Sequence, residues 1–173
     1  MLNIFQKPKK ELSEAQKIEI LHKNAEEMCD KFFAEKFSHF GLQEYRYNPQ
    51  EAVEELGLDE DMIWQLVDDY VSQIIKAIIQ FDSYLEELQN SQDNKRELDY
   101  TPFRELAHKN LGVARNLRIK DAEALLYDLM REDDLKHLLA CLEALKVCAI
   151  KLSPKCAYNT IKLIKVKNSL DLE

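Results

Sequence analysis

The sequence predicts an all-α protein built as a roughly antiparallel bundle of amphipathic helices. The chain has 173 residues, of which 46% are hydrophobic and 32% charged, with only three glycines and four prolines. So few glycines and prolines argue against collagen-like, low-complexity and turn-rich β-sandwich chains. Apolar residues recur at spacings of three and four in several segments, and the polar connections between these segments are short. The length fits one domain with an appendage.

The first helix is predicted to start at Ser13. In Ser13-Glu14-Ala15-Gln16 the serine and glutamine side chains can each bond the other's free backbone amide, which forms a capping box. An apolar stripe then runs to about Phe37, and Gly41 stops the helix. We expect this helix to pack on its own bundle, rather than to swap into a dimer or dock on a partner, because its phenylalanines must be buried.

Two more helices are predicted before the middle of the chain. A short helix spans residues 50–56 and ends at Gly57. Asp59 can cap the next one, whose continuous apolar stripe over residues 63–88 predicts a helix of about 30 residues. The all-polar stretch 89–96 is predicted to be a loop.

The second half of the chain is predicted to hold three helices. Thr101 caps the first, Asp121 caps the second, and Asp133 or Asp134 caps the last, which ends before Pro154. In the remaining tail apolar residues alternate with lysines, which leaves a short strand and an ordered extension both open. The chain thus divides into an N-terminal helical extension (residues 1–45), a helical bundle (46–153) that contains the core, and a C-terminal tail (154–173).

Charge and composition exclude several classes of function. With 24 Lys and Arg against 32 Asp and Glu, the net charge of −8 has the wrong sign for a nucleic-acid partner. The most apolar stretch is interrupted by polar residues and falls short of the roughly 20 apolar residues that a membrane span needs. There is no apolar signal segment at the start, so a soluble, cytoplasmic protein is expected. Three isolated glycines cannot form a phosphate-binding loop, and no cofactor is expected.

Most of the reactive side chains do not group into a site. His22, His39 and His137 fall on different predicted elements, without a second ligand at a metal-binding offset, so no metal site is expected. The four cysteines form no C-x-x-C pair. Cys141 and Cys148 lie on one helix face among leucines, which is typical of core packing.

One histidine differs from the others because of its neighbours on the helix over residues 103–117. At about 100° per residue from Phe103, the apolar side chains lie within about 80°, whereas His108 lies near 140° and Gly112 near 180°. His108 therefore faces outward, with Arg104 and Arg115 on its flank. A histidine nitrogen is a competent nucleophile and arginine stabilises negative charge, so this group suits a phosphoryl ligand. A helical glycine costs about 1 kcal/mol relative to alanine, which indicates that Gly112 leaves room for close approach.

The run AHKNLGVARNL over residues 107–117 resembles the phosphoacceptor signature of histidine-containing phosphotransfer (HPt) domains, A-H-x-L-K-G-x-A-x-x-L. The resemblance covers about residues 47–152. It implies an antiparallel four-helix bundle, here with an additional N-terminal helix. It also implies that His108 is the phosphoacceptor and that Gly112 opens space beside the ring. Arg104 and Arg115 are then expected to supply positive charge. Arg118 stands where the family often has a glycine, which affects the turn.

By this resemblance the protein is a phosphocarrier of a two-component phosphorelay. It takes a phosphoryl group from an aspartate of a response-regulator receiver domain or a hybrid histidine kinase, and it has no kinase activity of its own. The expected partner surface surrounds His108 and consists of Arg104, Glu105, Lys109, Arg115 and Asn116. The family commonly has lysine where this chain has Leu111. This difference favours an alternative, a helical adaptor that binds a receiver domain or another signalling protein without carrying phosphate.

Overall fold

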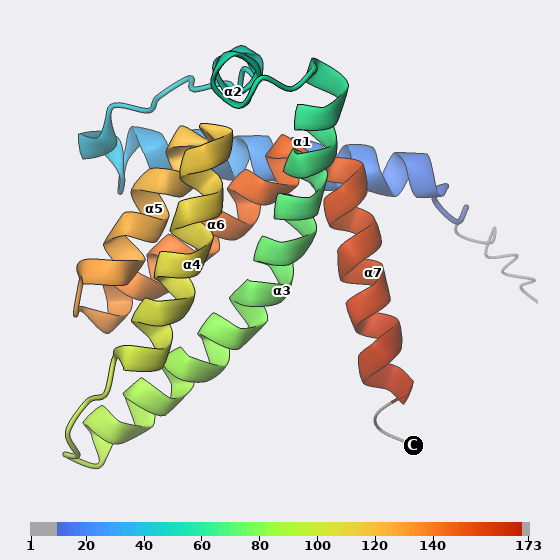
Figure 1. Cartoon of the computed structure of the whole chain (residues 1–173). Helices are drawn as coiled ribbons and strands as arrows, with labels where there is room; N and C mark the ends of the chain where they lie inside the picture. Colours follow the sequence, from blue (N-terminus) through green and yellow to red (C-terminus); the bar gives the residue numbers. More distant parts are fainter. Residues whose placement is uncertain (1–9, 171–173) are drawn as a thin grey trace, which may run out of the picture.

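The protein is helical throughout the part of the chain that the computed structural model describes, residues 10–170 (Figure 1). The elements are α1 (Glu14–Ala34), a 3-10 helix (Ser38–Phe40), α2 (Gln50–Leu56), α3 (Glu60–Asp93), α4 (Thr101–Leu117), α5 (Lys120–Arg131), α6 (Leu135–Leu152) and α7 (Pro154–Leu170). The all-α prediction is confirmed for these residues. Residues 1–9, which begin the predicted extension and include the start where no signal segment was expected, lie outside the described residues. So do residues 171–173 of the predicted tail.

Several helices begin where their capping residues predict. The Ser13 hydroxyl accepts a hydrogen bond from the Gln16 amide at 3.2 Å, and the Gln16 side chain accepts one from the Ser13 amide at 2.9 Å. This is the predicted capping box. The Asp59 carboxylate caps α3 and the Asp134 carboxylate caps α6 in the same way. Each cap satisfies backbone N–H groups that have no partner within the helix.

Four predicted boundaries differ from the structure. The first helix was expected to run to about Phe37, but α1 ends at Ala34, and it is the separate 3-10 helix that ends at Gly41. The stretch 89–96 was expected to be a loop, but α3 continues to Asp93. No glycine or proline interrupts the helix, and the side-chain amide of Gln89 donates to the Asp93 carboxylate, one turn further on, at 3.1 Å. Thr101 is the first residue of α4 rather than its cap. Tyr100 stands at the cap position without a side-chain cap bond, and the Asp99 carboxylate accepts from the Thr101 amide at 3.0 Å. Asp121 lies inside α5 rather than at its cap.

The tail is an ordered extension, and its strand alternative is wrong. Pro154 ends α6 as expected, but it also opens α7, because proline suits the first turn of a helix, where its missing N–H has no partner to lose. Ala157 and Thr160 of α7 are buried. Lysines between the apolar residues of α7 remain exposed, which produces the alternation seen in the sequence.

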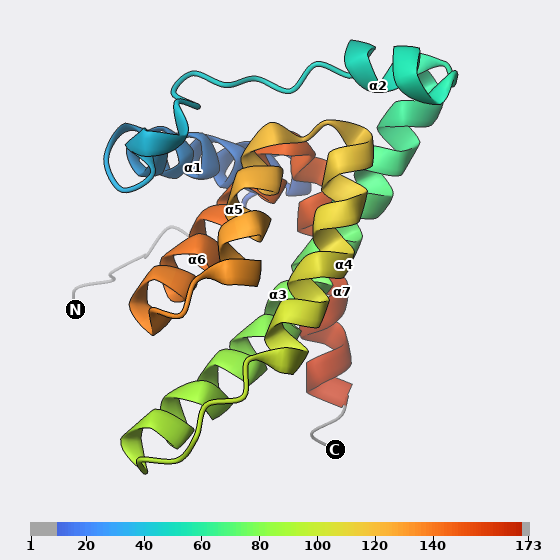
Figure 2. The ribbon, with the colours of Figure 1, turned by 60° about the vertical axis from the view of Figure 1, so that its left-hand side comes forward.

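Helices α3 to α6 contact one another in a closed ring. Each packs against the next in the chain, and α6 returns to α3 (Figures 1 and 2). Outside this ring, α1 lies across α6 and α7, and α7 also packs along α3. Among residues 10–170 no helix combines the length and the apolar character of a membrane span.

The core extends beyond the predicted bundle (46–153). Phe33 and Phe37, from α1 and the turn after it, join the buried cluster, as does Ala157 of α7. The expectation that the N-terminal helix packs on its own bundle is thus confirmed. Cys29 of α1 and Cys148 of α6 are also buried, with their sulfur atoms 3.7 Å apart.

Candidate functional site

Helix α4 presents one buried face and one exposed face. Its buried residues are Phe103, Ala107, Asn110, Leu111, Ala114 and Leu117, and they pack towards α3 and α5. His108 and Gly112 are exposed on the opposite face, one turn apart. Within residues 10–170 the His108 ring forms no hydrogen bond, so both of its nitrogens are open to a partner or to solvent.

Gly112 is not required by the packing of the helix. Its backbone is helical, and a Cβ atom placed on it meets no heavy atom of the described residues within 4 Å, apart from its chain neighbours and the backbone of its own helix. A side chain at this position would extend into open space, one turn from His108. Neither a positive φ nor a close neighbour explains why this residue is a glycine. The distinguishing feature of the position is therefore the open space above it.

Arg104 is held towards the turn between α5 and α6. Its guanidinium pairs with the Asp133 carboxylate and lies over the Tyr100 ring, 4.9 Å from the ring centroid. The Tyr100 hydroxyl in turn donates to the Asp133 carbonyl at 2.8 Å. The Arg104 Nε is buried and has no hydrogen-bond partner among residues 10–170. Arg104 therefore flanks His108 as part of an arginine–carboxylate pair.

Arg115 is also paired. Its Nε donates to the Glu123 carboxylate of α5 at 3.2 Å. The Arg115 side chain is 48% exposed, and ion pairs at such exposure contribute about 0–1 kcal/mol, so the pair can open at little cost. The structure thus brings His108, Gly112, Arg104 and Arg115 to one side of α4, with both arginines leaning towards acids outside the helix.

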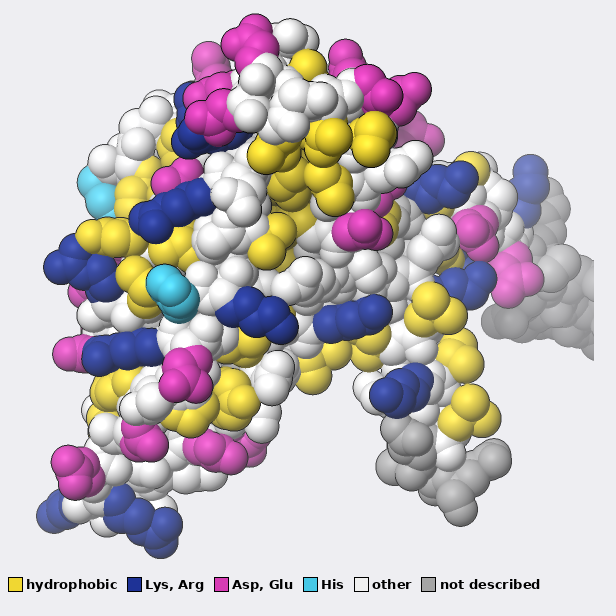
Figure 3. Space-filling view, viewed as in Figure 1, with side chains coloured by type: hydrophobic (Ala, Val, Ile, Leu, Met, Phe, Trp, Pro, Cys, Tyr) yellow, Lys and Arg dark blue, Asp and Glu magenta, His cyan; other side chains and the backbone are white. Residues whose placement is uncertain are grey.

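The two residues before Gly112 face inward. Leu111 is buried in the core, and Asn110 is 1% exposed. The Asn110 amide donates to the Leu106 carbonyl at 2.9 Å and accepts from Gln73 of α3 at 3.4 Å. Lys109, by contrast, is exposed on the outward face. In Figure 3 basic side chains and a histidine gather over α4, on the same face of the molecule.

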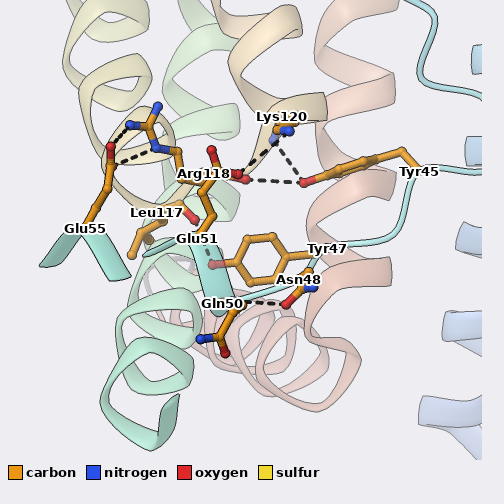
Figure 4. Close-up of polar contacts among 9 residues, drawn as sticks. All are labelled: Tyr45, Tyr47, Asn48, Gln50, Glu51, Glu55, Leu117, Arg118 and Lys120. Atoms are coloured by element: carbon orange, nitrogen blue, oxygen red, sulfur yellow. Dashed lines mark hydrogen bonds and ion pairs between the residues drawn. The ribbon is translucent and has the colours of Figure 1, made fainter. Parts of the chain in front are cut away.

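The end of α4 is fixed by two tyrosines from the segment that joins α1 to α2 (Figure 4). The Tyr47 hydroxyl donates to the Leu117 carbonyl at 2.7 Å. The Tyr45 hydroxyl donates to the Arg118 carbonyl at 3.3 Å and accepts from the Lys120 amide at 3.1 Å. Burial raises the pKa of Tyr47 to about 12 and that of Tyr45 further, so both hydroxyls remain protonated donors. We call this pair the tyrosine clamp.

Arg118 closes α4 with a left-handed backbone. Its φ is 60°, a conformation that glycine adopts without strain. The Arg118 side chain reaches α2 and donates from Nε to the Glu55 carboxylate at 2.8 Å (Figure 4). This ion pair raises the pKa of the Arg118 guanidinium.

The residues with donor atoms suited to a metal lie elsewhere, on α5 and α6. Asp128, His137 and Cys141 bring one oxygen, one nitrogen and one sulfur within 4.8 Å of one another. Cys141 is buried in the core, as its place among leucines predicts, whereas no ligand role was expected for His137. The spacing of His137 and Cys141, four residues apart on one helix, was the available signal, but Asp128 joins them only through the packing of α5 on α6.

No family model, curated protein or solved structure matches the chain.

Proposed function

We propose that the protein is a histidine phosphocarrier, and that His108 accepts a phosphoryl group from the phosphoaspartate of a receiver domain and passes it to another. The observation that carries this proposal is the pairing of an exposed His108 with an exposed Gly112 that no packing requirement explains. A receiver domain has to bring its phosphoaspartate to the ring along the helix surface, and the missing side chain at Gly112 leaves that approach open.

The ring of helices α3 to α6 supports an HPt-like four-helix bundle, to which α1, α2 and α7 are additions. In such a bundle α4 is fixed along its buried face, and the tyrosine clamp fixes its end. A rigid support suits this chemistry, because phosphoryl transfer depends mainly on the positioning of the two reactants and on charge stabilisation.

In the transfer step a neutral His108 nitrogen attacks phosphorus. The bond between phosphorus and the aspartate oxygen breaks, and the aspartate leaves as a carboxylate with the bonding electron pair. The product is phosphohistidine on this protein. Negative charge on the transferred group is stabilised by the guanidinium of Arg115, released from the exposed Glu123 pair, and by Arg104.

A second candidate is a helical adaptor that binds a receiver domain without accepting phosphate. It is favoured by the pairing of both arginines with carboxylates and by the burial of Leu111, where the signature has lysine. Here His108 contributes to the contact surface alone, and its ring forms no bond to phosphorus.

The two candidates are distinguished by labelling. Receiver domains of the same organism, phosphorylated with a radioactive phosphoryl group, are mixed with the wild-type protein, with His108→Gln and with the matched control His22→Gln on α1. The phosphocarrier predicts an acid-labile label on the wild type and on His22→Gln, and none on His108→Gln. A receiver domain that binds the wild type firmly without labelling it supports the adaptor. A label that persists on His108→Gln excludes His108 as the acceptor.

A further inference from the structure

Three side chains with different donor atoms meet between α5 and α6. The His137 Nε2 lies 2.9 Å from an Asp128 carboxylate oxygen and 3.5 Å from the Cys141 sulfur. His137 and Cys141 are four residues apart on α6 and so share one face of that helix. Asp128 belongs to α5, which packs against α6. The three donor atoms therefore converge from two helices towards one point.

The surroundings hold these side chains in place. Cys141 is fully buried, whereas the side chains of His137 and Asp128 are 24% and 16% exposed. The Phe37 ring lies 5.9 Å from the His137 ring, centroid to centroid, which restricts its rotation. The pKa of the Cys141 thiol is raised to about 12, first by burial and then by the charges of Asp128 and Glu132, against a smaller opposite effect of Lys36.

This arrangement does not suit nucleophilic catalysis. A catalytic triad uses one imidazole nitrogen for the nucleophile and the other for the carboxylate. In this cluster the same nitrogen, Nε2, faces both Cys141 and Asp128. The cysteine is also fully buried, whereas reactive cysteines are accessible. Convergence of three donors on one point is instead what a metal ion requires.

We propose that Asp128, His137 and Cys141 form a zinc-binding site that links α5 to α6. Zinc binds cysteine sulfur at about 2.3 Å and histidine nitrogen or carboxylate oxygen at about 2.0–2.2 Å, in tetrahedral geometry. Such bonds place the donor atoms about 3.3–3.7 Å from one another. The sulfur–nitrogen distance of 3.5 Å already lies in this range, and the nitrogen–oxygen distance of 2.9 Å needs to open by a few tenths of an ångström.

The protons and charges of the bound state balance. The Cys141 S–H bond breaks, its proton passes to solvent, and a zinc–sulfur bond forms. His137 binds as neutral imidazole through Nε2, with its proton on Nδ1, and Asp128 binds as a carboxylate. Thiolate and carboxylate together neutralise the two charges of Zn²⁺, and a water molecule takes the fourth position.

An ion reaches the site from the Asp128 side. Asp128 lines a surface cleft of about 420 Å³, together with Phe40 and Tyr127. The partly exposed carboxylate can meet the hydrated ion first, before the buried sulfur completes the set. Arg115 and Glu123 also line this cleft, but neither they nor His108 supplies a donor atom to the cluster, so the inference does not depend on the proposed function.

Titration of the untagged, reduced full-length protein with Co²⁺ tests the proposal, because cobalt replaces zinc and its bond to a thiolate gives a charge-transfer absorption band. The wild type is expected to bind one equivalent with this band, and one equivalent of Zn²⁺ is expected to displace the cobalt and to raise the melting temperature. Cys141→Ser should lose the band. Cys156→Ser, which removes a half-buried cysteine on α7, is the matched control and should retain it.

Asp128→Asn replaces the carboxylate by an amide of the same shape and leaves Cys141 in place. It should weaken cobalt binding while the circular dichroism spectrum stays unchanged. This variant keeps the proposal testable if Cys141→Ser fails to fold. The proposal is overturned if the wild type gives no thiolate band, if the band survives in Cys141→Ser, if it is lost in Cys156→Ser instead, or if Asp128→Asn binds cobalt as tightly as the wild type.

Discussion

Replacement of Gly112 by alanine should stabilise the protein. Gly112 lies in the interior of the 17-residue helix α4, where glycine costs about 1 kcal/mol relative to alanine. Beyond the backbone of its own helix and its chain neighbours, the added methyl group meets no atom of the described residues within 4 Å, so no steric cost offsets this gain. The expected gain of about 1 kcal/mol in the free energy of unfolding corresponds to a rise of about 2–4 °C in melting temperature for a chain of this size.

The same position separates stability from function when a longer side chain is introduced. Glutamine is also a good helix former, so Gly112→Gln should be at least as stable as the wild type. Its side chain, however, occupies the open space one turn from His108. We therefore expect Gly112→Gln to slow phosphoryl transfer from a receiver domain at least tenfold, equivalent to about 1.4 kcal/mol in the barrier.

Both variants are compared by urea denaturation and by the initial rate of labelling. The control is Ala34→Gln, which adds glutamine at an exposed position of α1, a helix that packs on α6 and α7. A loss of stability in Gly112→Ala would show that the fold needs the glycine and would refute the structural reasoning. Transfer at the wild-type rate in Gly112→Gln would show that a partner does not use this space.

Three further changes test the fold and its pH dependence. Lys95 follows α3 with a φ of 55°, so Lys95→Gly should be about 1 kcal/mol more stable than Lys95→Ala in urea denaturation. Tyr47→Phe removes the hydrogen bond to the Leu117 carbonyl and should cost about 1 kcal/mol by the same measurement. Burial raises the pKa of Asp121, so the native state binds this proton more tightly than the unfolded chain, and stability falls as pH rises through the raised pKa. Asp121→Asn should therefore be more stable than the wild type at neutral pH, with the difference closing as the pH falls towards the ordinary pKa of aspartate.

Equal stability of Lys95→Gly and Lys95→Ala would mean that the left-handed backbone is not strained. An unchanged free energy of unfolding in Tyr47→Phe would remove the hydroxyl as an anchor of α4. A difference between Asp121→Asn and the wild type that stays constant from neutral to acid pH would show that ionisation of Asp121 does not destabilise the native state.

The helix starts were predictable where the signal is local. Ser13, Asp59 and Asp134 cap their helices through bonds that span two or three residues, and the sequence within one turn contains all the information. The end of α3 and the existence of α7 were not predictable in this way. Both segments are polar or lysine-rich; α7 is helical because a few of its residues, such as Ala157, pack against other helices.

In the candidate site too, local features could be predicted from the sequence, whereas contacts between helices could not. Rotation about a single helix is enough to predict that His108 and Gly112 face away from the core. It cannot predict that Arg104 meets Asp133 or that Arg115 meets Glu123, because these contacts depend on how α5 and the turn after it pack on α4. The approach of Asp128 to His137 depends on the packing of α5 on α6 and was missed for the same reason.

The tyrosine clamp also has a consequence for the order of folding. Its hydrogen bonds join residues 70 to 75 positions apart, whereas α4 and α5 adjoin through a two-residue turn. Closing so long a loop carries an entropic cost that the local contact between α4 and α5 avoids, so the clamp should form after these helices have met. The amide of Lys120, bonded to the Tyr45 hydroxyl, should then exchange with deuterated solvent whenever the segment between α1 and α2 lifts away, while the interior amides of α4 remain protected.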